Sequence, residues 1–345
     1  MKSLLRFISK IYELLVRLRN KLYDRGWLKV HRLDRPVISV GNLTLGGTGK
    51  TPTVITLGKI LQQSGYSVSV LLRGYKGHYG GGPLLVSDGN QLRTEASRAG
   101  DEALVIAKNL PTALVTVAKN RAAAGKWVES WSSVDVHLLD DGFQHRRVDR
   151  CLDLVLVDVT NPFGGGSIVP SGKLREPVEA LRRADAVILT RTHPGNSYQP
   201  LITQVQHLKP DIPCFLAMQV LQSASERTAQ GELVEVSLAR CRALAFAGLA
   251  NPKQFFDSLR DGQVELAETL YFPDHHRYTP RDLTAIRDRC RDLQIKTVIT
   301  TEKDSENFLV SSLAPLRVLT VKVTFEFKGN GLRRLLAQVM AEAPQ

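Results

Sequence analysis

The stretch SVGNLTLGGTGKTP, residues 39–52, decides the fold that the sequence predicts. It matches the phosphate-binding pattern G-x-x-x-x-G-K-[ST], except that Thr44 stands where the pattern begins with glycine. Such a match indicates a phosphate-binding loop only when a strand precedes it and a helix follows it. Both are present, because the apolar run 36–40 precedes the loop and a segment with helical spacing, 51–65, follows it. The sequence therefore predicts a nucleotide-binding loop, although a glycine-rich turn in a doubly wound sheet is an alternative.

The loop has the residues that a nucleoside triphosphate requires. Glycines let backbone amides converge on phosphate oxygens at the N-terminus of the following helix. Lys50 is expected to reach the β- and γ-phosphates, and the Thr51 hydroxyl is expected to bind Mg²⁺. The residues predicted to bind ATP and its phosphates are Thr44, Gly46, Gly47, Thr48, Gly49, Lys50 and Thr51.

Apolar runs bounded by turn residues alternate with helical stretches from about residue 36 to residue 220. This rhythm predicts an α/β fold of the P-loop NTPase type, with a doubly wound, mostly parallel sheet and helices on both faces. The polar stretch 222–232 interrupts it. We therefore expect a P-loop core domain at 31–221 and a smaller C-terminal α/β domain at 222–345, joined by a β-ribbon near 214–238.

The first 30 residues are predicted to form an amphipathic helix. The chain has a formal net charge of +12, and residues 1–35 contain ten Lys and Arg against three Asp and Glu. Apolar side chains recur at helical spacing in one stripe, with basic residues opposite. The stripe consists of Leu4, Ile8, Ile11, Leu15, Leu18 and Leu22. No apolar run there exceeds three residues, so a spanning helix is not expected. The pattern favours a helix on an anionic membrane surface, and the alternative is a helix docked on the protein's own core.

Several classes of protein are not expected. Zinc-finger spacing, an aromatic RNA-binding signature and a helix-turn-helix pattern are all missing from the sequence, so nucleic acid is not an expected partner. The four cysteines are far apart, which indicates neither a disulfide framework nor a zinc site. Nothing in the sequence indicates an obligate protein partner.

Three groups of residues are candidates for the chemistry. Asp140 and Asp141 end an apolar run, as a Walker-B element does, and either could bind Mg²⁺. Asp101 lies at a predicted helix start, where it could be a proton acceptor for a hydroxyl or only a cap. The motif FPDHHRY, which contains His275 and His276, is either functional or an ordinary polar loop.

With these motifs in order, the chain resembles the tetraacyldisaccharide 4′-kinases, the lipid A 4′-kinases of Gram-negative bacteria. Further matching blocks are LLRGYKG (71–77), GDEA (100–103), LLDDGFQHRRVDRCLDLVLVD (138–158), PSGKLREP (170–177), FAGLANPKQFF (246–256), FPDHHRY (272–278) and TTEKD (300–304). The family itself has serine or threonine where the loop pattern has its first glycine, so Thr44 agrees with the resemblance.

The resemblance implies transfer of the γ-phosphoryl group of ATP, with Mg²⁺, to the 4′-hydroxyl of a tetraacylated glucosamine disaccharide 1-phosphate. It implies a peripheral or monotopic protein at the cytoplasmic face of the inner membrane. It assigns the role of the base to Asp101, paired with His275, and leaves His276 as the alternative partner. It assigns Mg²⁺ binding to Asp140 and a catalytic role to Asp141. Substrate-binding or supporting residues are expected to be Arg73, Tyr75, Glu102, Arg121, Gln144 and His145.

Two rival interpretations remain on the sequence alone. One is another P-loop ATPase or ligase, and the other is a membrane-bound nucleotide-sensing scaffold without phosphoryl transfer. A GTPase is not favoured, because the guanine-reading pattern N-K-x-D has only a loose match at TTEKD.

Overall fold

The computed structural model describes residues 2–75, 77–227, 233–249, 251–274 and 276–343. The chain forms two compact units, one made of residues 1–218 with 325–345 and the other of residues 219–324. The last stretch therefore belongs to the first unit, whereas the sequence analysis placed it in the C-terminal domain. The chain leaves the first unit after Met218, shortly before the polar stretch that begins at residue 222, but no comparable composition change marks its return.

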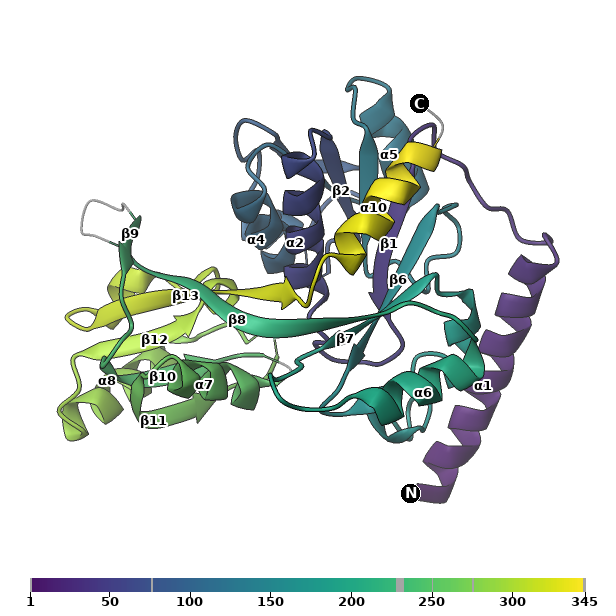
Figure 1. The fold of residues 1–345 in the computed structure, drawn as a ribbon. Helices are drawn as coiled ribbons and strands as arrows, with labels where there is room; N and C mark the ends of the chain where they lie inside the picture. The colour runs from purple at the N-terminus through teal and green to yellow at the C-terminus, as the bar shows by residue number, and fades with distance from the viewer. Residues whose placement is uncertain (1, 76, 228–232, 250, 275, 344–345) are drawn as a thin grey trace. The chain divides into compact units, whose positions relative to one another are not determined.

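The first unit is built on a mostly parallel sheet (Figure 1). Its strand order is β8-β7-β6-β1-β5-β2-β4-β3, in which β3 runs antiparallel to β4. The strands are β1 (Val37–Asn42), β2 (Val68–Leu72), β3 (Leu84–Asp88), β4 (Leu114–Val117), β5 (Val136–Asp140), β6 (Leu152–Asp158), β7 (Ala186–Thr190) and β8 (Cys214–Arg227). The predicted α/β class with a mostly parallel sheet is confirmed.

Helices cover both faces of this sheet. Leu138 packs in the core that also contains residues of α2 (Lys50–Gln63), α4 (Asp101–Asn109) and α10 (Gly331–Glu342). Its neighbour Leu139 packs with α5 (Arg121–Glu129), because successive strand residues point to opposite faces. This unit also contains α3 (Ala96–Ala99), α6 (Gln199–Leu208), and the 3₁₀ helices η1 (Pro162–Gly165) and η2 (Val178–Arg183).

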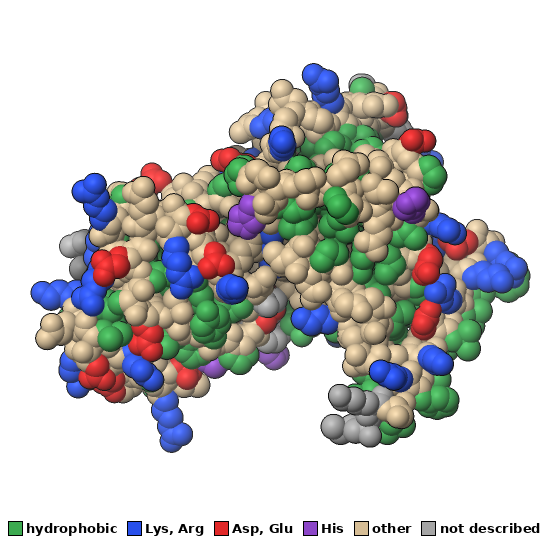
Figure 2. Space-filling view, turned by 60° about the horizontal axis from the view of Figure 1, so that its bottom comes forward, with side chains coloured by type: hydrophobic (Ala, Val, Ile, Leu, Met, Phe, Trp, Pro, Cys, Tyr) green, Lys and Arg blue, Asp and Glu red, His purple; other side chains and the backbone are tan. Residues whose placement is uncertain are grey.

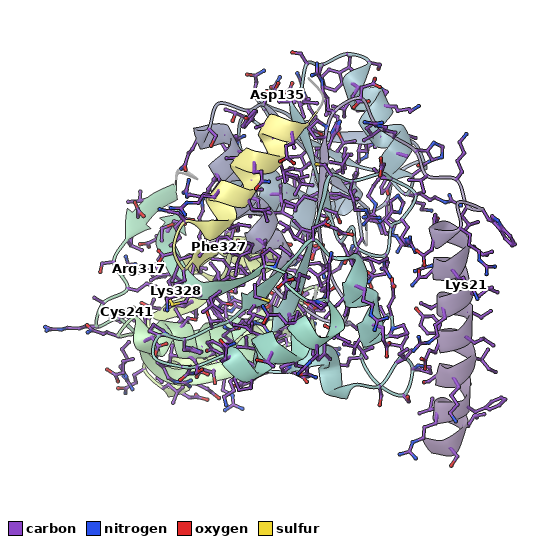
Figure 3. The ribbon with its side chains drawn as sticks, turned by 45° about the vertical axis from the view of Figure 1, so that its right-hand side comes forward. Lys21, Asp135, Cys241, Arg317, Phe327 and Lys328 are labelled. Carbon is purple, nitrogen blue, oxygen red and sulfur yellow. The ribbon has the colours of Figure 1, made fainter. Side chains whose placement is uncertain are left out.

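The second unit is a smaller α/β arrangement with parallel strands in the order β11-β10-β12-β13. Its strands are β10 (Arg242–Ala247), β11 (Glu265–Tyr271), β12 (Thr297–Thr301) and β13 (Arg317–Phe327), and its helices are α7 (Pro252–Asp261), α8 (Pro280–Asp292), α9 (Glu302–Ser305) and η3 (Val310–Leu313). β9 (Leu233–Val236) pairs antiparallel with the end of β8. The chain then leaves β13 through Phe327 and Lys328 and enters α10 (Figure 3).

The N-terminal helix α1 (Lys2–Asp24) contacts the rest of the first unit through polar side chains. The Ser9 hydroxyl lies 3.0 Å from the carbonyl oxygen of Ile168, and the Tyr12 hydroxyl donates to the carbonyl of Arg175. Only Ser9 and Val16 are buried among the described residues of the helix. α1 is thus docked by a narrow, mainly polar side.

The apolar stripe of α1 points away from this docking side. Leu4, Ile8, Ile11, Leu15 and Leu18 are all exposed, together with Phe7 and Leu14. Hydrophobic side chains follow the helix at the lower right of Figure 2, and Figure 3 shows side chains projecting freely from the helix that carries Lys21. The alternative in which the stripe packs on the protein's own core is therefore wrong. Among the described residues, no helix has the length and apolar character to cross a bilayer.

A buried carboxylate fixes the second half of α1. Glu176 is fully buried, and its oxygens lie 3.2 Å from Arg19, 2.7 Å from Asn20 and 3.0 Å from Arg183. Two residues of α1 are thereby tied to the same carboxylate as η2. Removing one partner of such a buried pair leaves unpaired charge in the interior.

We predict that Glu176→Ala lowers the free energy of unfolding by about 3–5 kcal/mol, because Arg19 and Arg183 lose their shared partner. The matched control is Glu179→Ala, whose ion pair with Arg17 is half-exposed on both sides and is expected to contribute less than about 1 kcal/mol. Urea titrations followed by circular dichroism measure both. Equal stability of the two variants would contradict this role of Glu176.

Candidate active site

The predicted loop lies between β1 and α2. Gly46 and Gly49 have φ values of 111° and 90°, which glycine adopts without strain. A Cβ atom on Gly49 would also lie 2.2 Å from the ring of Phe325. The Thr53 hydroxyl donates to the carbonyl of Gly49 at 2.9 Å and so closes the first turn of α2. Strand, glycine loop and helix thus follow one another as the motif requires.

The loop is held from two sides. On one side, the amide of Leu45 donates to the carbonyl of Lys173 at 2.7 Å. On the other, the Thr190 hydroxyl donates to the carbonyl of Thr48 at 3.0 Å, and Arg191 bonds both the carbonyl of Gly47 and Asp158. These contacts fix the backbone of the loop through one amide, that of Leu45, and through the carbonyls of Gly47 and Thr48.

The loop lysine meets the acidic end of β5. Lys50 Nζ lies 3.5 Å from Asp141 Oδ1 and 3.5 Å from Asn42 Oδ1. Arg175 approaches the two oxygens of Asp141 at 2.9 and 2.8 Å. Asp141 thus lies between two cations, and Asp140 directly precedes it.

The two adjacent aspartates have opposite pKa shifts. Burial raises the pKa of Asp140 to about 7, and the neighbouring charges of Glu102 and Asp141 add to the effect. Burial also acts to raise the pKa of Asp141, but Lys50 and Arg175 outweigh it and hold that pKa at about 2. Asp141 is therefore ionised throughout the physiological range, whereas burial favours the neutral form of Asp140.

Arg121 supports the turn that follows β5. Its guanidinium is buried and donates to the carbonyls of Asp140 at 2.8 Å and Asp141 at 3.1 Å. Burial lowers its pKa to about 10, so the group stays protonated near neutrality. The amide of Gln144 donates to the carbonyl of Asn42 at 2.9 Å, which joins this turn to the end of β1. Both residues donate to backbone carbonyls here, and their predicted role as substrate-binding or supporting residues stays a prediction.

Asp101 begins α4 and is only 8% exposed. One of its oxygens accepts from the amide of Glu102 at 3.0 Å. The preceding Gly100 has φ 88°, and a Cβ atom there would lie 2.6 Å from the carbonyl oxygen of Tyr75. Asp101 is thereby placed directly beside the loop that follows β2.

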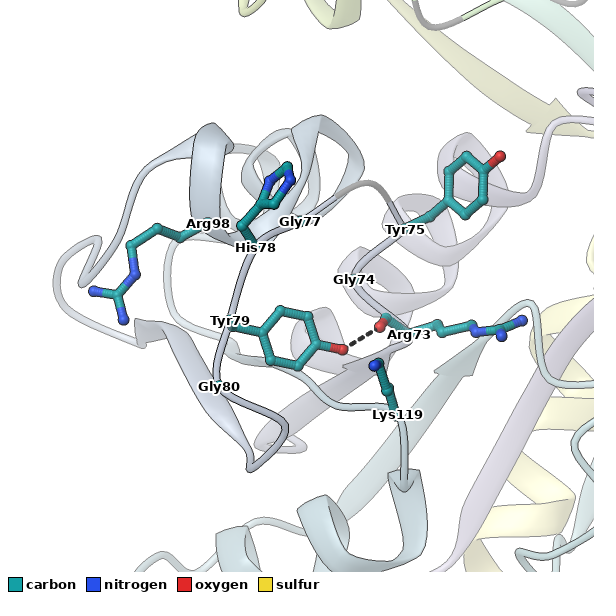
Figure 4. A pocket seen from close by; sticks show the side chains of 9 residues that line it. All are labelled: Arg73, Gly74, Tyr75, Gly77, His78, Tyr79, Gly80, Arg98 and Lys119. Carbon is teal, nitrogen blue, oxygen red and sulfur yellow. Dashed lines mark hydrogen bonds between the residues drawn. The ribbon is translucent and has the colours of Figure 1, made fainter.

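That loop lines a cavity of about 590 Å³ (Figure 4). Its lining consists of Arg73, Gly74, Tyr75, Gly77, His78, Tyr79, Gly80, Arg98 and Lys119. The Tyr79 hydroxyl donates to the carbonyl of Arg73 at 2.6 Å, and Lys119 reaches toward the same place. The predicted residues Arg73 and Tyr75 therefore share a cavity next to the start of α4.

The histidine motif lies in the second unit. His275 is outside the described residues, so its pairing with Asp101 stays a prediction. His276 lies 3.0 Å from Asp282 and stacks on Phe272 with ring centroids 4.9 Å apart. Asp274 lies 3.1 Å from Lys303. His276 thus has a packing role within its own unit.

Arg175 is the main site residue that the sequence analysis missed. It belongs to the block PSGKLREP, which was recognised as a matching block but assigned no role. Arg191, with φ 65° and a buried guanidinium, was missed as well. Both lie far along the chain from their partners, and no spacing rule connects a residue after β6 with the turn after β5, or a residue after β7 with the loop after β1.

Comparison with known proteins identifies the family of this chain. The family model described as tetraacyldisaccharide-1-P 4′-kinase matches residues 1–341. The chain belongs to this family. It is 40% identical to the tetraacyldisaccharide 4′-kinase of Pelobacter propionicus over 89% of this chain and 83% of that protein. It is 39% identical to the enzyme of the same name from Geobacter metallireducens over 88% of this chain and 87% of that protein.

A solved structure agrees with the fold. The crystal structure of LpxK from Aquifex aeolicus, in complex with ATP, matches with a TM-score of 0.76 and 30% sequence identity. The match covers 98% of this chain and 99% of that one. The predicted family and kinase activity in lipid A biosynthesis are confirmed, and the ATPase and scaffold alternatives are set aside.

We predict that Arg175→Gln lowers kcat/KM by about 10- to 100-fold, the usual effect of losing a group that orients a functional side chain. Without Arg175, Asp141 loses one of the two cations that hold it. The control is Arg182→Gln, an exposed arginine whose guanidinium bonds only the carbonyl of Leu208 among the described residues. Steady-state kinetics at varied acceptor concentration measure both, and activity of Arg175→Gln equal to that of the control would contradict the assignment.

Proposed function

We propose that the first unit transfers the γ-phosphoryl group of ATP to the 4′-hydroxyl of a tetraacylated disaccharide 1-phosphate, with the residues described above. The observation that carries this assignment is the contact of Lys50 with Asp141 at the first residue of α2. It joins the phosphate-binding end of the loop to the carboxylates of β5, as phosphoryl transfer requires. The ATP complex of the Aquifex relative supports the same co-substrate.

ATP is proposed to bind along the loop and the start of α2. The residues for its phosphates are Thr44, Gly46, Gly47, Thr48, Gly49, Lys50 and Thr51. Lys50 is held by Asn42 and Asp141, so its ammonium group is already positioned before a phosphate arrives. A positioned cation needs little reorganisation when charge develops on the transferring group.

The end of β5 is proposed to hold Mg²⁺. Asp140 lies close enough to Glu102 and Asp141 for their charges to raise its pKa, and a cation relieves such repulsion. Carboxylate and hydroxyl oxygens are the ligands that Mg²⁺ prefers. We assign the metal to Asp140 and Thr51, because Asp141 is already bound by Lys50 and Arg175. When bound, Mg²⁺ supplies neutralisation of the charge on the β- and γ-phosphates.

Asp101 is proposed as the base that accepts the proton of the 4′-hydroxyl. Asp101 is buried at the first residue of α4, and the preceding Gly100 lies against Tyr75, which lines the 590 Å³ cavity. In a loose transition state the proton leaves late, so a positioned carboxylate suffices. The family motif assigns His275 to act with Asp101, and this part rests on the motif alone.

α1 is proposed to lie on the anionic cytoplasmic face of the inner membrane, where a lipid acceptor is available. Its exposed apolar stripe supports this, since a helix of this kind buries such a face in the headgroup region. Basic residues on its other side, such as Lys10 and Arg17, suit an anionic surface.

The base assignment predicts that Asp101→Asn lowers the rate of phosphoryl transfer by about 100- to 10,000-fold, because the carboxylate can no longer take up the proton. The measurement follows label from γ-labelled ATP, with Mg²⁺, into detergent-dispersed acceptor lipid. ATP binding, measured by calorimetry, is expected to be unchanged. Retention of full transfer by Asp101→Asn would exclude this residue as the base.

The membrane assignment predicts that Leu14→Glu/Leu15→Glu weakens binding to vesicles with anionic lipid by at least about 100-fold, since two leucines no longer enter the bilayer. These side chains are 67% and 59% exposed, so folding is expected to be unaffected. The matched control is Leu92→Glu/Leu309→Glu, two exposed leucines outside α1. Vesicle flotation separates the two variants, and unchanged flotation of the α1 variant would rule out the assignment.

A further inference from the structure

A second cavity, of about 620 Å³, lies where α1 ends. It is lined by Arg19, Tyr23, Leu28, Lys29, His31, Gln144, His145, Arg146 and Arg147. Two segments form its frame, the stretch after α1 and the turn after β5. They are joined by backbone hydrogen bonds of 2.7 Å from His31 to Arg147 and 2.9 Å from Asp149 to His31. The cavity is therefore formed by two hydrogen-bonded segments of the first unit.

The lining is strongly basic. Six of its nine residues are Arg, Lys or His, and none is acidic. The charge of Arg19 is paired with that of Glu176, and the charge of Arg146 is paired with that of Asp24. Lys29 and Arg147, by contrast, have no hydrogen bond or ion pair from their side chains to any residue that the structure describes. The cavity therefore carries two cations without a counter-charge.

Two further polar groups, His145 and Arg146, belong to the lining. Nε2 of His145 is buried without a hydrogen-bond partner among the described residues, although buried polar atoms are normally paired. The guanidinium of Arg146 is fixed in place, because it lies 5.0 Å from the ring of Tyr23 and donates to the carbonyl of Asn20. An anion that entered the cavity would meet cations on a rigid frame, and His145 belongs to the same lining.

The position of the cavity indicates that its ligand belongs to a lipid. The exposed apolar residues Leu15 and Leu18 stand on the same helix whose end forms one wall. Trp27, between α1 and Lys29, is 70% exposed, and tryptophan is enriched at the level of lipid headgroups. A lipid whose acyl chains lie along α1 would thus carry its headgroup to this end of the helix.

The cavity also adjoins the reactive centre. Gln144, on its wall, bonds the end of β1 at Asn42 and lies 3.4 Å from Arg175, the partner of Asp141. A ligand held here is therefore connected to the phosphoryl-transfer site by one short turn. A cationic cavity with this connection suits a phosphate that is part of the acceptor or of its surrounding lipids.

We propose that this cavity binds a phosphate ester carried by a lipid, with Lys29 and Arg147 supplying the charge and His145 a hydrogen bond. The proposal rests on the proposed function in taking α1 as the membrane-contacting helix. The phosphate comes either from the 1-position of the acceptor or from a phospholipid headgroup.

The first test measures binding to the full-length protein of dihexanoylphosphatidic acid below its micelle concentration, with the nucleotide loop saturated by a non-hydrolysable ATP analogue. We expect Lys29→Ala/Arg147→Ala to weaken this binding at least about tenfold. Dihexanoylglycerol lacks the phosphate, and we expect it to bind the unchanged protein no more tightly than it binds the variant. Arg281→Ala/Lys296→Ala removes two exposed positive charges elsewhere and is expected to have no effect. Equal binding by both double variants would overturn the proposal.

A second measurement identifies the source of the phosphate. If it is the 1-phosphate, Lys29→Ala/Arg147→Ala raises KM for the acceptor but leaves KM for its 1-dephospho analogue unchanged. If it is a phospholipid headgroup, the variant loses binding to phosphatidylglycerol vesicles while KM at fixed surface concentration stays the same. A change in neither quantity would overturn the proposal, even where Asp101→Asn and the α1 variant confirm the proposed function.

Discussion

The ion pair between Lys50 and Asp141 is the contact on which the site depends. It brings together the first residue of α2 and the residue after β5, which are neighbours only because β1 and β5 pair in parallel. Parallel strands place their carboxyl ends at one edge of the sheet, so a loop after one strand meets a carboxylate after the next. Arg175 completes the arrangement from a third segment and keeps Asp141 ionised.

One segment connects this contact to α1. Residues 168–176 touch α1 through Ile168, Ser171 and Glu176, and they touch the loop where Lys173 accepts from the amide of Leu45. Arg175 lies on the same segment and binds Asp141. A displacement of α1 relative to the sheet would therefore act on residues that hold the loop and the carboxylate, because packed interiors transmit strain.

Local patterns in the sequence were sufficient for the elements of the site that lie on short motifs. The loop around Lys50, the pair Asp140 and Asp141, and the helix start at Asp101 each follow from residue types at fixed spacing. Arg175 and Arg191 did not follow, since their partners lie 34 and 144 residues away and only the folded sheet brings them together. The same reason explains why residues 325–345 were assigned to the wrong part of the chain. β13 begins in the second unit and ends in the first, and no change in composition marks that return.

The helical periodicity of α1 predicted an apolar stripe but not which side of the helix contacts the protein. Apolar area alone would favour docking by leucines, yet the helix is held by Ser9, Asn20 and other polar side chains. The fully buried Glu176 explains this choice. A buried carboxylate must be paired, and the oxygens of Glu176 are paired with Arg19, Asn20 and Arg183 in the observed rotational setting of the helix. Hydrophobic contact has little directional preference, whereas these hydrogen bonds fix the rotation of α1 and thereby keep its leucines exposed.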